Sequence, residues 1–275
     1  MIIDIVNKVG AYVKGENVLM GAASAEELNA LAPEGFRPKD LLSGAKTVLV
    51  FAHPLPSAVF LNSKDNDNPF YQRSAYIHYL MMDKLVNDAS LMIQEAGYSS
   101  LPIPSYSPLR FFEGEPRGII SLKHVAVRAG LGKMGRSTLL INPKYGNIMR
   151  LGALITEMEW SEYPVIDEKS PCPEGCRLCE KACPVGAIND DSVNKMSCMG
   201  KCIKHILLPP RFMLPMMQRA VAASKLLTKF MELTSLNFFE TYAIGCVACL
   251  KACIYFPGNK GKKLKAESIS LTVKN

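Results

Sequence analysis

The sequence predicts an α/β domain followed by a second, cysteine-rich domain. Two observations carry this prediction. Apolar patterns typical of helices and of strands alternate from Ile2 to Thr156, and all nine cysteines lie between Cys172 and Cys253. With 48% hydrophobic and 21% charged residues, the composition is that of a folded globular chain and excludes a disordered one.

Two helices and a strand are predicted in the first part of the chain. Valine and isoleucine recur at helical spacing over Ile2–Val13, and Ser24–Glu27 has the pattern of a capping box that starts a second helix. Thr47–Ala52 is a β-branched and aromatic run that Pro54 stops, so it is expected to be a buried strand.

A long helix and another strand follow. After a polar loop at Asn62–Pro69, the stretch Tyr71–Ala96 contains no proline or glycine and ends at Gly97, a standard stop signal for a helix. The apolar run Ile148–Thr156 predicts a further strand. Helices and strands therefore alternate, which indicates the α/β class.

The composition changes at 164–171, where proline, acidic residues and serine precede the first cysteines. We predict an α/β cofactor and substrate domain at 1–165, a cysteine-bearing domain at 166–258 and a basic tail at 259–275. The second domain contains a helical insert at 207–241 that is rich in Met and Leu. We expect the insert to pack internally or to form a subunit contact, as in a homodimer, with a membrane-surface amphipathic helix as the alternative.

Charge and targeting features limit the binding partners and the cellular compartment that we expect. The 32 basic and 25 acidic residues give a formal net charge of +7, which favours an anionic substrate or partner but does not predict nucleic-acid binding. The amino terminus has no basic region, twin arginine or cleavage site, and no apolar stretch is long enough for a membrane span. We expect a cytoplasmic protein whose thiols stay reduced and available to metals.

Two cysteine motifs predict two iron–sulfur clusters. The first has three-, two- and three-residue gaps and ends in Cys-Pro, and a shorter motif follows downstream. Such runs wrap around a four-iron cube, and in two-cluster ferredoxins the last cysteine of a motif ligates the other cluster. On this geometry, one cluster takes Cys172, Cys176, Cys179 and Cys253. The other takes Cys183, Cys246, Cys249 and either Cys198 or Cys202.

Other uses of the cysteines fit the spacing less well. Zinc sites favour separated pairs of cysteines over a run of four, and a dithiol redox motif would leave most of the thiols without a role. Two clusters imply electron transfer from an external donor such as a ferredoxin or flavodoxin. The preceding α/β domain implies that a group held there receives the electrons.

A glycine motif lies late in the α/β domain. Gly130–Gly135 satisfies G-x-G-x-x-G, and Glu157 follows at about the distance of a ribose-binding acid. A dinucleotide-binding motif, however, opens a helix directly after a strand and usually stands near the start of its domain. Here the apolar run Thr138–Ile141 follows, so NAD binding is the weaker interpretation.

The residues around this motif resemble the epoxyqueuosine reductase and reductive dehalogenase superfamily. The resemblance rests on Ala129–Ile141, Tyr145–Gly146 and Leu151–Thr156, followed by the cysteine motifs, and it covers roughly residues 40–256. The chain looks like a short, divergent member. The resemblance implies a nitroreductase-like α/β sandwich that holds cobalamin, followed by a ferredoxin-like domain whose two clusters reduce it.

The resemblance also implies roles for individual residues. Tyr71–His78 would begin the helix beside the active site. Cys198, rather than Cys202, would be the eighth cluster ligand, because relatives place this cysteine at a similar distance after the Cys-Pro motif. The loop residues at the cofactor would be Gly130, Leu131, Gly132, Gly135, Ser137 and Thr138.

The sequence departs from these relatives at several points. Their acidic proton donor is missing, since the corresponding stretch reads Pro116–Ile120, and the nearest acids, Glu113 and Glu115, are expected to be solvated. Proline does not follow Cys253 directly. We also expect neither a tRNA-binding repeat region nor a twin-arginine leader.

Other side chains are candidates for the proton donor. Histidine titrates near neutrality, while tyrosine and lysine donate protons when burial or neighbouring charge lowers their pKa. Lys123 and His124, on a short predicted helix at Leu122–Arg128, form the preferred pair. The further candidates are His78, Tyr106, Tyr76 and His53.

We therefore expect an iron–sulfur oxidoreductase that passes electrons through two 4Fe–4S clusters to a corrinoid-type cofactor and on to a small-molecule substrate. Two alternatives stay open: an NAD- or flavin-linked iron–sulfur reductase, and a non-catalytic electron-donating activator of a corrinoid protein. A deep pocket over the glycine loop would favour an enzyme, and a flat apolar surface would favour the activator.

Overall fold

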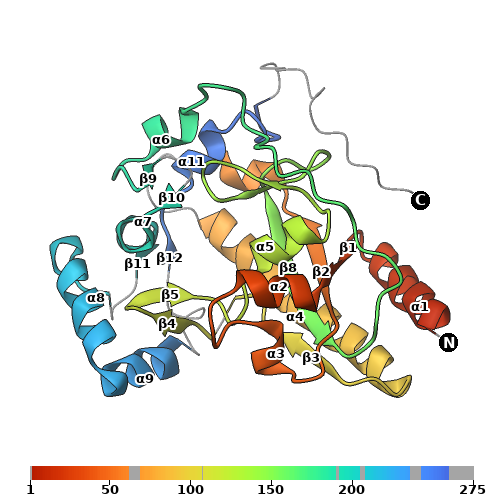
Figure 1. Cartoon of the computed structure of the whole chain (residues 1–275). Helices are drawn as coiled ribbons and strands as arrows, with labels where there is room; N and C mark the ends of the chain where they lie inside the picture. The colour runs from red at the N-terminus through yellow and green to blue at the C-terminus, as the bar shows by residue number, and fades with distance from the viewer. Residues whose placement is uncertain are drawn as a thin grey trace.

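The computed structural model describes residues 2–61, 69–106, 108–189, 192–204, 208–235 and 243–259. The predicted polar loop and the predicted basic tail lie almost entirely outside these ranges. Within them, a layered sandwich of helices and strands carries the cysteine-bearing segments at one end, and two further helices lie at one side (Figure 1). The mixed α/β content predicted from the sequence is confirmed.

A four-stranded antiparallel sheet forms the centre of the sandwich. Its order is β1 (Leu19–Ser24), β2 (Thr47–Pro54), β8 (Met149–Thr156) and β3 (Ser100–Ile103), and every neighbouring pair runs antiparallel. Six consecutive residues of β2, 47–52, are fully buried. The predicted buried strand and the predicted strand at 148–156 are thus confirmed as the two central strands.

Helices cover both faces of this sheet. The helices α1 (Ile2–Gly15) and α4 (Pro69–Glu95) pack on the face that presents Leu49 and Phe51, while α2 (Ala25–Leu31) and α5 (Leu122–Arg128) pack on the opposite face. The predicted bounds of these helices agree to within about two residues, a normal uncertainty for helix ends. Ser24 caps α2 as the sequence predicts, since its hydroxyl accepts a hydrogen bond from the Glu27 N–H.

The short elements were not predicted, apart from helical structure within the insert. They comprise α3 (Pro38–Leu41), a hairpin of β4 (Arg110–Phe112) and β5 (Glu115–Arg117), and a hairpin of β6 (Lys133–Met134) and β7 (Leu140–Ile141). The cysteine-bearing half contains α6 (Leu178–Ala182), β9 (Ile188–Asn189), β10 (Ser192–Val193), α7 (Lys195–Cys202), β11 (Ile203–Lys204), α8 (Leu214–Ala223), α9 (Lys225–Thr234), β12 (Ala243–Ile244) and α11 (Ala248–Ala252).

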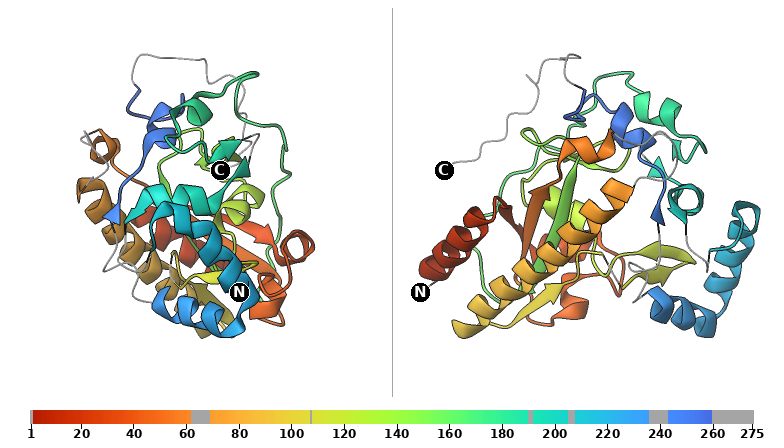
Figure 2. Two further views of the ribbon diagram at one scale, coloured as in Figure 1. Left: turned by 90° about the vertical axis from the view of Figure 1, so that its left-hand side faces the viewer. Right: turned by 180° about the vertical axis from the view of Figure 1, so that it is seen from behind.

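The helical insert packs on the β4–β5 hairpin. Glu232 accepts a hydrogen bond from the Phe111 N–H at 3.3 Å, and the Ser235 hydroxyl accepts one from the Leu109 N–H at 2.9 Å. A β-carbon added at Gly114 would lie 2.2 Å from the carbonyl oxygen of Gln218, so only glycine permits this approach. Figure 2 shows α8 and α9 at the edge of the molecule, away from the central sheet.

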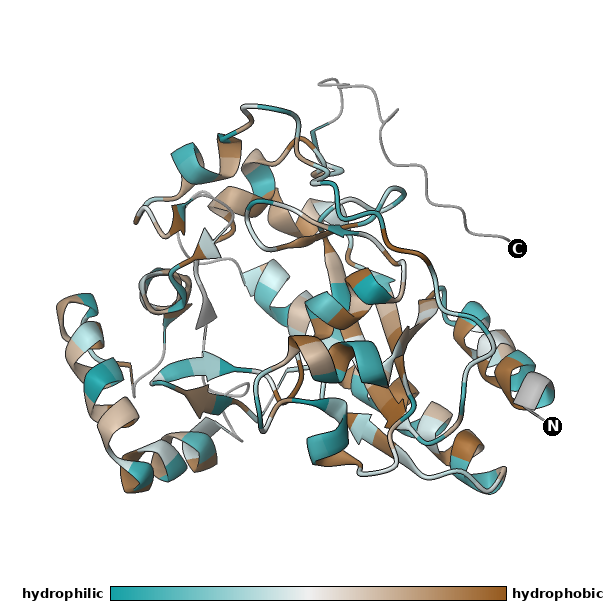
Figure 3. Cartoon of the chain, viewed as in Figure 1, coloured by the Kyte–Doolittle hydropathy of each residue, from teal (hydrophilic) through white to brown (hydrophobic). Residues whose placement is uncertain are grey.

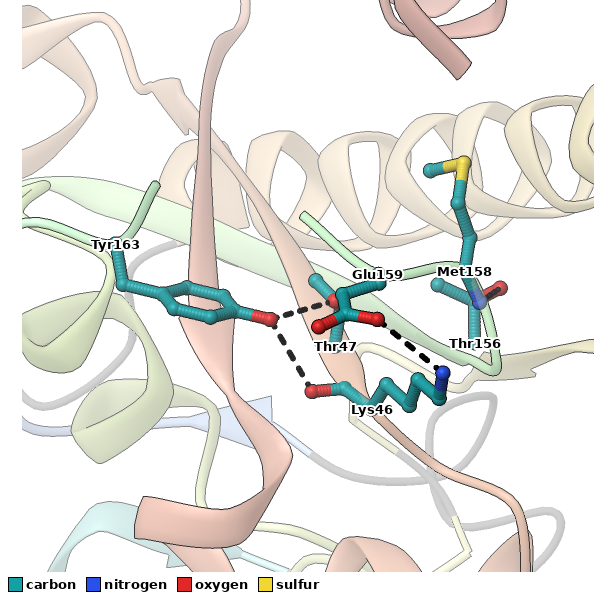
Figure 4. Close-up of polar contacts among 6 residues, drawn as sticks. All are labelled: Lys46, Thr47, Thr156, Met158, Glu159 and Tyr163. Carbon is teal, nitrogen blue, oxygen red and sulfur yellow. Dashed lines mark hydrogen bonds and ion pairs between the residues drawn. The ribbon is translucent and has the colours of Figure 1, made fainter. Parts of the chain in front are cut away.

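The segment between β8 and the first cysteine is fixed to the sandwich. The Tyr163 hydroxyl lies 2.8 Å from the Thr47 hydroxyl and donates to the Lys46 carbonyl at 3.3 Å (Figure 4). Farther along, Lys133 donates a hydrogen bond to Asp167 at 2.6 Å. These contacts hold the segment between β8 and the first cysteine against the sandwich.

Hydropathy follows the layers. Apolar residues gather in the strands of the central sheet, whereas the outer helices carry both hydrophobic and hydrophilic residues (Figure 3). Of the helices in the described part of the chain, none combines the length and the apolar character that crossing a bilayer requires.

We expect Tyr163→Phe to lower the free energy of unfolding by about 1–2 kcal/mol, because the fully buried Thr47 hydroxyl would lose its partner. Urea unfolding followed by circular dichroism measures this change. The control is Glu159→Gln, which removes a 3.2 Å ion pair with Lys46. The side chain of Glu159 is 72% exposed and that of Lys46 is 56% exposed. That loss should cost less than about 0.5 kcal/mol. Equal shifts in the two variants would contradict the structural role of Tyr163.

Candidate functional site

Four cysteines, three from the first motif and one from the distant second motif, line one pocket. Cys172, Cys176, Cys179 and Cys253 surround it together with Gly135, Arg136 and Ser137 from the glycine loop. The helices α6 and α11, which carry or adjoin these cysteines, pack on each other. The pocket thus brings together the four residues predicted to hold the first cluster.

Backbone N–H groups point at two of the cysteine sulfurs. The Arg136 N–H lies 3.4 Å from Cys172 Sγ, and the Ala187 N–H lies 3.2 Å from Cys183 Sγ. Such donors stabilise a thiolate, which is the form that binds metal. The Arg136 guanidinium also pairs with Glu180 of α6 at 3.1 Å, and this contact fixes the glycine loop to the pocket.

The remaining cysteines form a second group. The thiol of Cys249 interacts electrostatically with Cys183, Cys198, Cys202 and Cys246. Burial raises the pKa of Cys249 and of Cys202 to about 12 each, and it also raises the pKa of Cys198. All nine cysteines are free thiols. The second group therefore contains every residue predicted for the second cluster, and both candidates for its last ligand.

Cys198 and Cys202 differ in their surroundings, although both lie on α7. Cys198 interacts electrostatically with Cys183 and Cys246. The Cys202 thiol instead donates a hydrogen bond to the Cys246 carbonyl at 3.2 Å, and its electrostatic neighbours among the thiols are Cys198, Cys246 and Cys249. The Cys202 thiol is thus engaged by the backbone, which distinguishes it from Cys198.

A single metal ion and a four-iron cluster require different arrangements of their ligands. Among the residues with described positions, no three His, Cys, Asp or Glu side chains converge closely enough to hold one metal ion. A zinc site needs such convergence, because each of its sulfurs lies about 2.3 Å from the same ion. A four-iron cube places each thiolate on a different iron, so its ligands surround the cluster.

The first two glycines of the motif have structural explanations. Gly130, with a φ of +72°, ends α5 in a Schellman arrangement, in which the Gly130 N–H bonds to Val127 and the Leu131 N–H to Ala126. A β-carbon at Gly132 would lie 2.5 Å from the carbonyl oxygen of Ile141. The motif therefore follows a helix and enters the β6–β7 hairpin, which is not the strand–turn–helix context of dinucleotide binding.

Lys123 and His124 lie on α5, near the second cysteine group. Lys123 donates a 2.7 Å hydrogen bond to the carbonyl of Thr138, which itself has a positive φ of 55°. Burial and then the nearby Lys195 lower the pKa of Lys123, whereas Cys198 raises it. The pKa of His124 is lowered by burial, and its Nδ1 lies 2.6 Å from the Ser121 hydroxyl.

The other predicted donors lie on and beside α4. His78 stacks against His53 with ring centroids 5.0 Å apart, and burial lowers the pKa of His53. The Tyr106 ring lies 5.1 Å from the Tyr79 ring. The structure thus brings His78 close to His53 and Tyr106 close to Tyr79, and it places Lys123 and His124 on a different helix. Glu115 is paired with Lys195 at 3.0 Å.

Sequence reasoning missed Arg150, Tyr71 and Tyr79. Arg150 donates to the Tyr71 hydroxyl, and its guanidinium lies 4.8 Å from the centre of the Tyr79 ring. Burial raises the pKa of Tyr79 to about 12, and Tyr79 and Arg150 both interact electrostatically with Cys202. The sequence signal that could have identified Arg150 is its position as a charged residue inside the apolar run Ile148–Thr156. Half-buried cations and the Tyr79 hydroxyl therefore lie beside the second cysteine group.

Sequence comparisons find relatives over parts of the chain, although no protein-family model matches it. An epoxyqueuosine reductase of Listeria monocytogenes is 37% identical over 83 residues, 30% of this chain and 21% of the relative. One of Bacillus anthracis is 25% identical over 158 residues, 55% of this chain and 38% of the relative. A tetrachloroethene reductive dehalogenase of Desulfitobacterium hafniense is 40% identical over 75 residues, 26% of this chain and 13% of the relative. These matches thus span less than half of each relative.

Solved structures resemble the fold over nearly the whole chain. An epoxyqueuosine reductase from Bacillus subtilis superposes with a TM-score of 0.58 at 18% identity, over 97% of this chain and 68% of that one. An epoxyqueuosine reductase with a tRNA stem loop gives a TM-score of 0.60 at 19% identity. At these identities the likeness is one of fold. Together with the sequence matches, it confirms the predicted resemblance to the epoxyqueuosine reductase and reductive dehalogenase superfamily.

We expect Gly132→Ala to lower the free energy of unfolding by about 1–3 kcal/mol, because its methyl group would overlap the Ile141 carbonyl and the backbone would have to move. The matched control is Gly15→Ala, since nothing lies within 4 Å of a β-carbon at Gly15. The control should change stability by less than about 0.5 kcal/mol. Thermal unfolding of both variants measures the difference, and an unchanged Gly132 variant would contradict the packing role.

Proposed function

We propose that this protein is an iron–sulfur oxidoreductase in which two 4Fe–4S clusters pass electrons to a corrinoid-type cofactor that reduces a small-molecule substrate. The observation that carries the proposal is the arrangement of the thiols: four cysteines line one pocket, and a second group adjoins polar side chains of the sandwich. The sequence relatives, which are named as reductases, support the redox chemistry.

The thiol environments support a specific ligand set. The first cluster would be held by Cys172, Cys176, Cys179 and Cys253. The second would be held by Cys183, Cys198, Cys246 and Cys249. Cys202 would be the spare cysteine, because its thiol is engaged by the backbone carbonyl of Cys246.

Exposure suggests the direction of electron flow. Leu178, which lines the first pocket, is 44% exposed, and the neighbouring Arg177 is also exposed. An external donor such as a ferredoxin or flavodoxin would therefore deliver electrons to the first cluster. The second cluster would pass them on, because its thiols lie beside Lys123, Arg150 and Tyr79.

The residues beside the second cluster would be able to attract an anionic electron acceptor and to donate protons to it. A bound corrinoid would supply low-valent metal chemistry at this place. Lys123 and Arg150 are half-buried cations that would attract negative charge. Tyr79, whose pKa is about 12, keeps its proton at physiological pH and is a candidate proton donor. The other candidate donors are His78, Tyr106, Lys123 and His124.

The proposal extends to the layout of the chain. Residues 1–165 would form a nitroreductase-like cofactor domain, with the loop Gly130–Thr138 beside the cofactor, and 166–258 a ferredoxin-like domain. The loop fits this role only partly, since Gly135–Ser137 line the first cysteine pocket. A reducing compartment such as the cytoplasm would preserve nine free thiols.

The first test is the metal and cofactor content. Protein purified or reconstituted without oxygen should contain about eight irons per chain, as two four-iron clusters require. It should also bind cobalamin stoichiometrically, which absorption spectroscopy and metal analysis for iron and cobalt together establish. Two zincs without iron would refute the clusters. Eight irons with tight NADH binding and no corrinoid affinity would favour the NAD-linked alternative.

The second test separates two cysteines on the same helix. Cys198→Ala should lose or convert one cluster, because one iron would lack its thiolate, whereas Cys202→Ala should keep about eight irons per chain. Iron analysis and electron paramagnetic resonance of the reduced protein read out both variants. The reverse pattern would make Cys202 the ligand, and unchanged iron in both would refute the cross-ligated arrangement.

A further inference from the structure

We propose that the outer face of α8 and α9 binds the surface of an anionic phospholipid bilayer. This inference is independent of the proposed function. The face, here called the insert face, consists of the exposed side chains of residues 208–235. Figure 2 shows that both helices lie at the edge of the molecule.

The insert face has an unusual chemical composition. Every exposed side chain of residues 208–235 is either apolar or basic, and none is acidic or an uncharged hydrogen-bonding group. Its large apolar members are Phe212, Met216, Leu226, Phe230 and Leu233, with exposed fractions of 82%, 66%, 83%, 55% and 60%. Side chains of this size and exposure mark an interaction surface when they lie together.

The apolar and basic side chains form neighbouring stripes on α9. Leu226, Phe230 and Leu233 follow one another at spacings of four and three residues, so they share one side of the helix. Lys225 and Lys229 lie four residues apart on an adjacent stripe. An apolar side bordered by lysines is the pattern of a helix that lies in a membrane interface.

The same pattern continues onto α8 and the turn before it. Phe212 and Met216 lie four residues apart and share one side, and Arg219 adjoins them. The opposite side of this helix is occupied by contacts within the protein, since Leu214 and Val221 are buried. The exposed apolar residues are therefore not part of the core.

The inner side of the insert is already used. Glu232 and Ser235 bind the backbone of the β4–β5 hairpin, and α7 packs against α8. Glu232 is also the single acidic residue of 208–235, which contain four basic residues. Its engagement with the hairpin leaves the outer face purely cationic and apolar.

Charge and chemistry identify the occupant. Residues 208–235 have a formal charge of +3, so two copies of this face would repel each other. The face offers no uncharged polar side chain for the direct hydrogen bonds that a typical protein interface contains. A bilayer with anionic headgroups complements both features, because lysine and arginine approach the headgroups while phenylalanine and leucine enter the acyl boundary.

The experiment measures partition of the intact chain onto vesicles. The protein, prepared without oxygen, is sedimented with vesicles of phosphatidylcholine alone or of phosphatidylcholine mixed with phosphatidylglycerol. We expect binding to the mixed vesicles at least about tenfold tighter than to the neutral ones, weakening as salt rises. Leu226→Glu combined with Phe230→Glu should reduce partition at least about tenfold.

A matched variant controls for exposed apolar residues in general. Leu91 on α4 is 57% exposed and lies outside the insert, so Leu91→Glu should bind vesicles like the parent chain. Circular dichroism and iron content confirm that all variants fold. Absence of vesicle binding, or equal binding by the insert variant, would overturn the proposal. So would a dimer, seen by analytical ultracentrifugation, that Leu226→Glu dissociates while vesicle binding stays absent.

Discussion

The junction between the sandwich and the cysteines depends on close backbone approaches that only glycine permits. At Gly132 a β-carbon would lie 2.5 Å from the Ile141 carbonyl oxygen. At Gly146, where φ is +66°, it would lie 2.0 Å from the carbonyl oxygen of Tyr255. The first approach lies within the β6–β7 hairpin. The second packs the segment after α11, at Tyr255, against the turn after β7 that contains Gly146. The β6–β7 hairpin and the turn after it therefore position the glycine loop and the segment Cys253–Tyr255, which both line the first pocket.

The same segment connects cysteines that are far apart in sequence. Arg136 directs its N–H to Cys172 and its guanidinium to Glu180, while Asn147 donates a 2.9 Å hydrogen bond to the carbonyl of Leu250 on α11. A glycine motif that looks like a phosphate-binding loop in sequence is thus part of the wall of a cysteine pocket. Its glycines serve backbone packing, which explains why the motif follows a helix instead of opening one.

Local patterns in the sequence were sufficient for the long elements, and the four cysteines predicted to share one cluster line one pocket. The helix at 69–95, the strand at 47–54 and the cap at Ser24 follow from spacing and composition. The strand β1 was not predicted, because Leu19–Ser24 lacks β-branched residues and is specified by pairing with β2. Arg150 and Tyr79 could not be assigned for a similar reason, since their contact depends on how α4 crosses the sheet.

The charges around the second cysteine group fit the proposed cluster better than a set of empty thiols. Lys123 is half-buried and is repelled by Lys195, and both effects lower its pKa. Burying a cation costs free energy unless a negative charge lies nearby. Neutral thiols provide no such charge, whereas thiolates that hold an iron–sulfur centre do. Lys123, which interacts with Cys198, and Arg150, which interacts with Cys202, would then partly balance the charge of such an anionic centre.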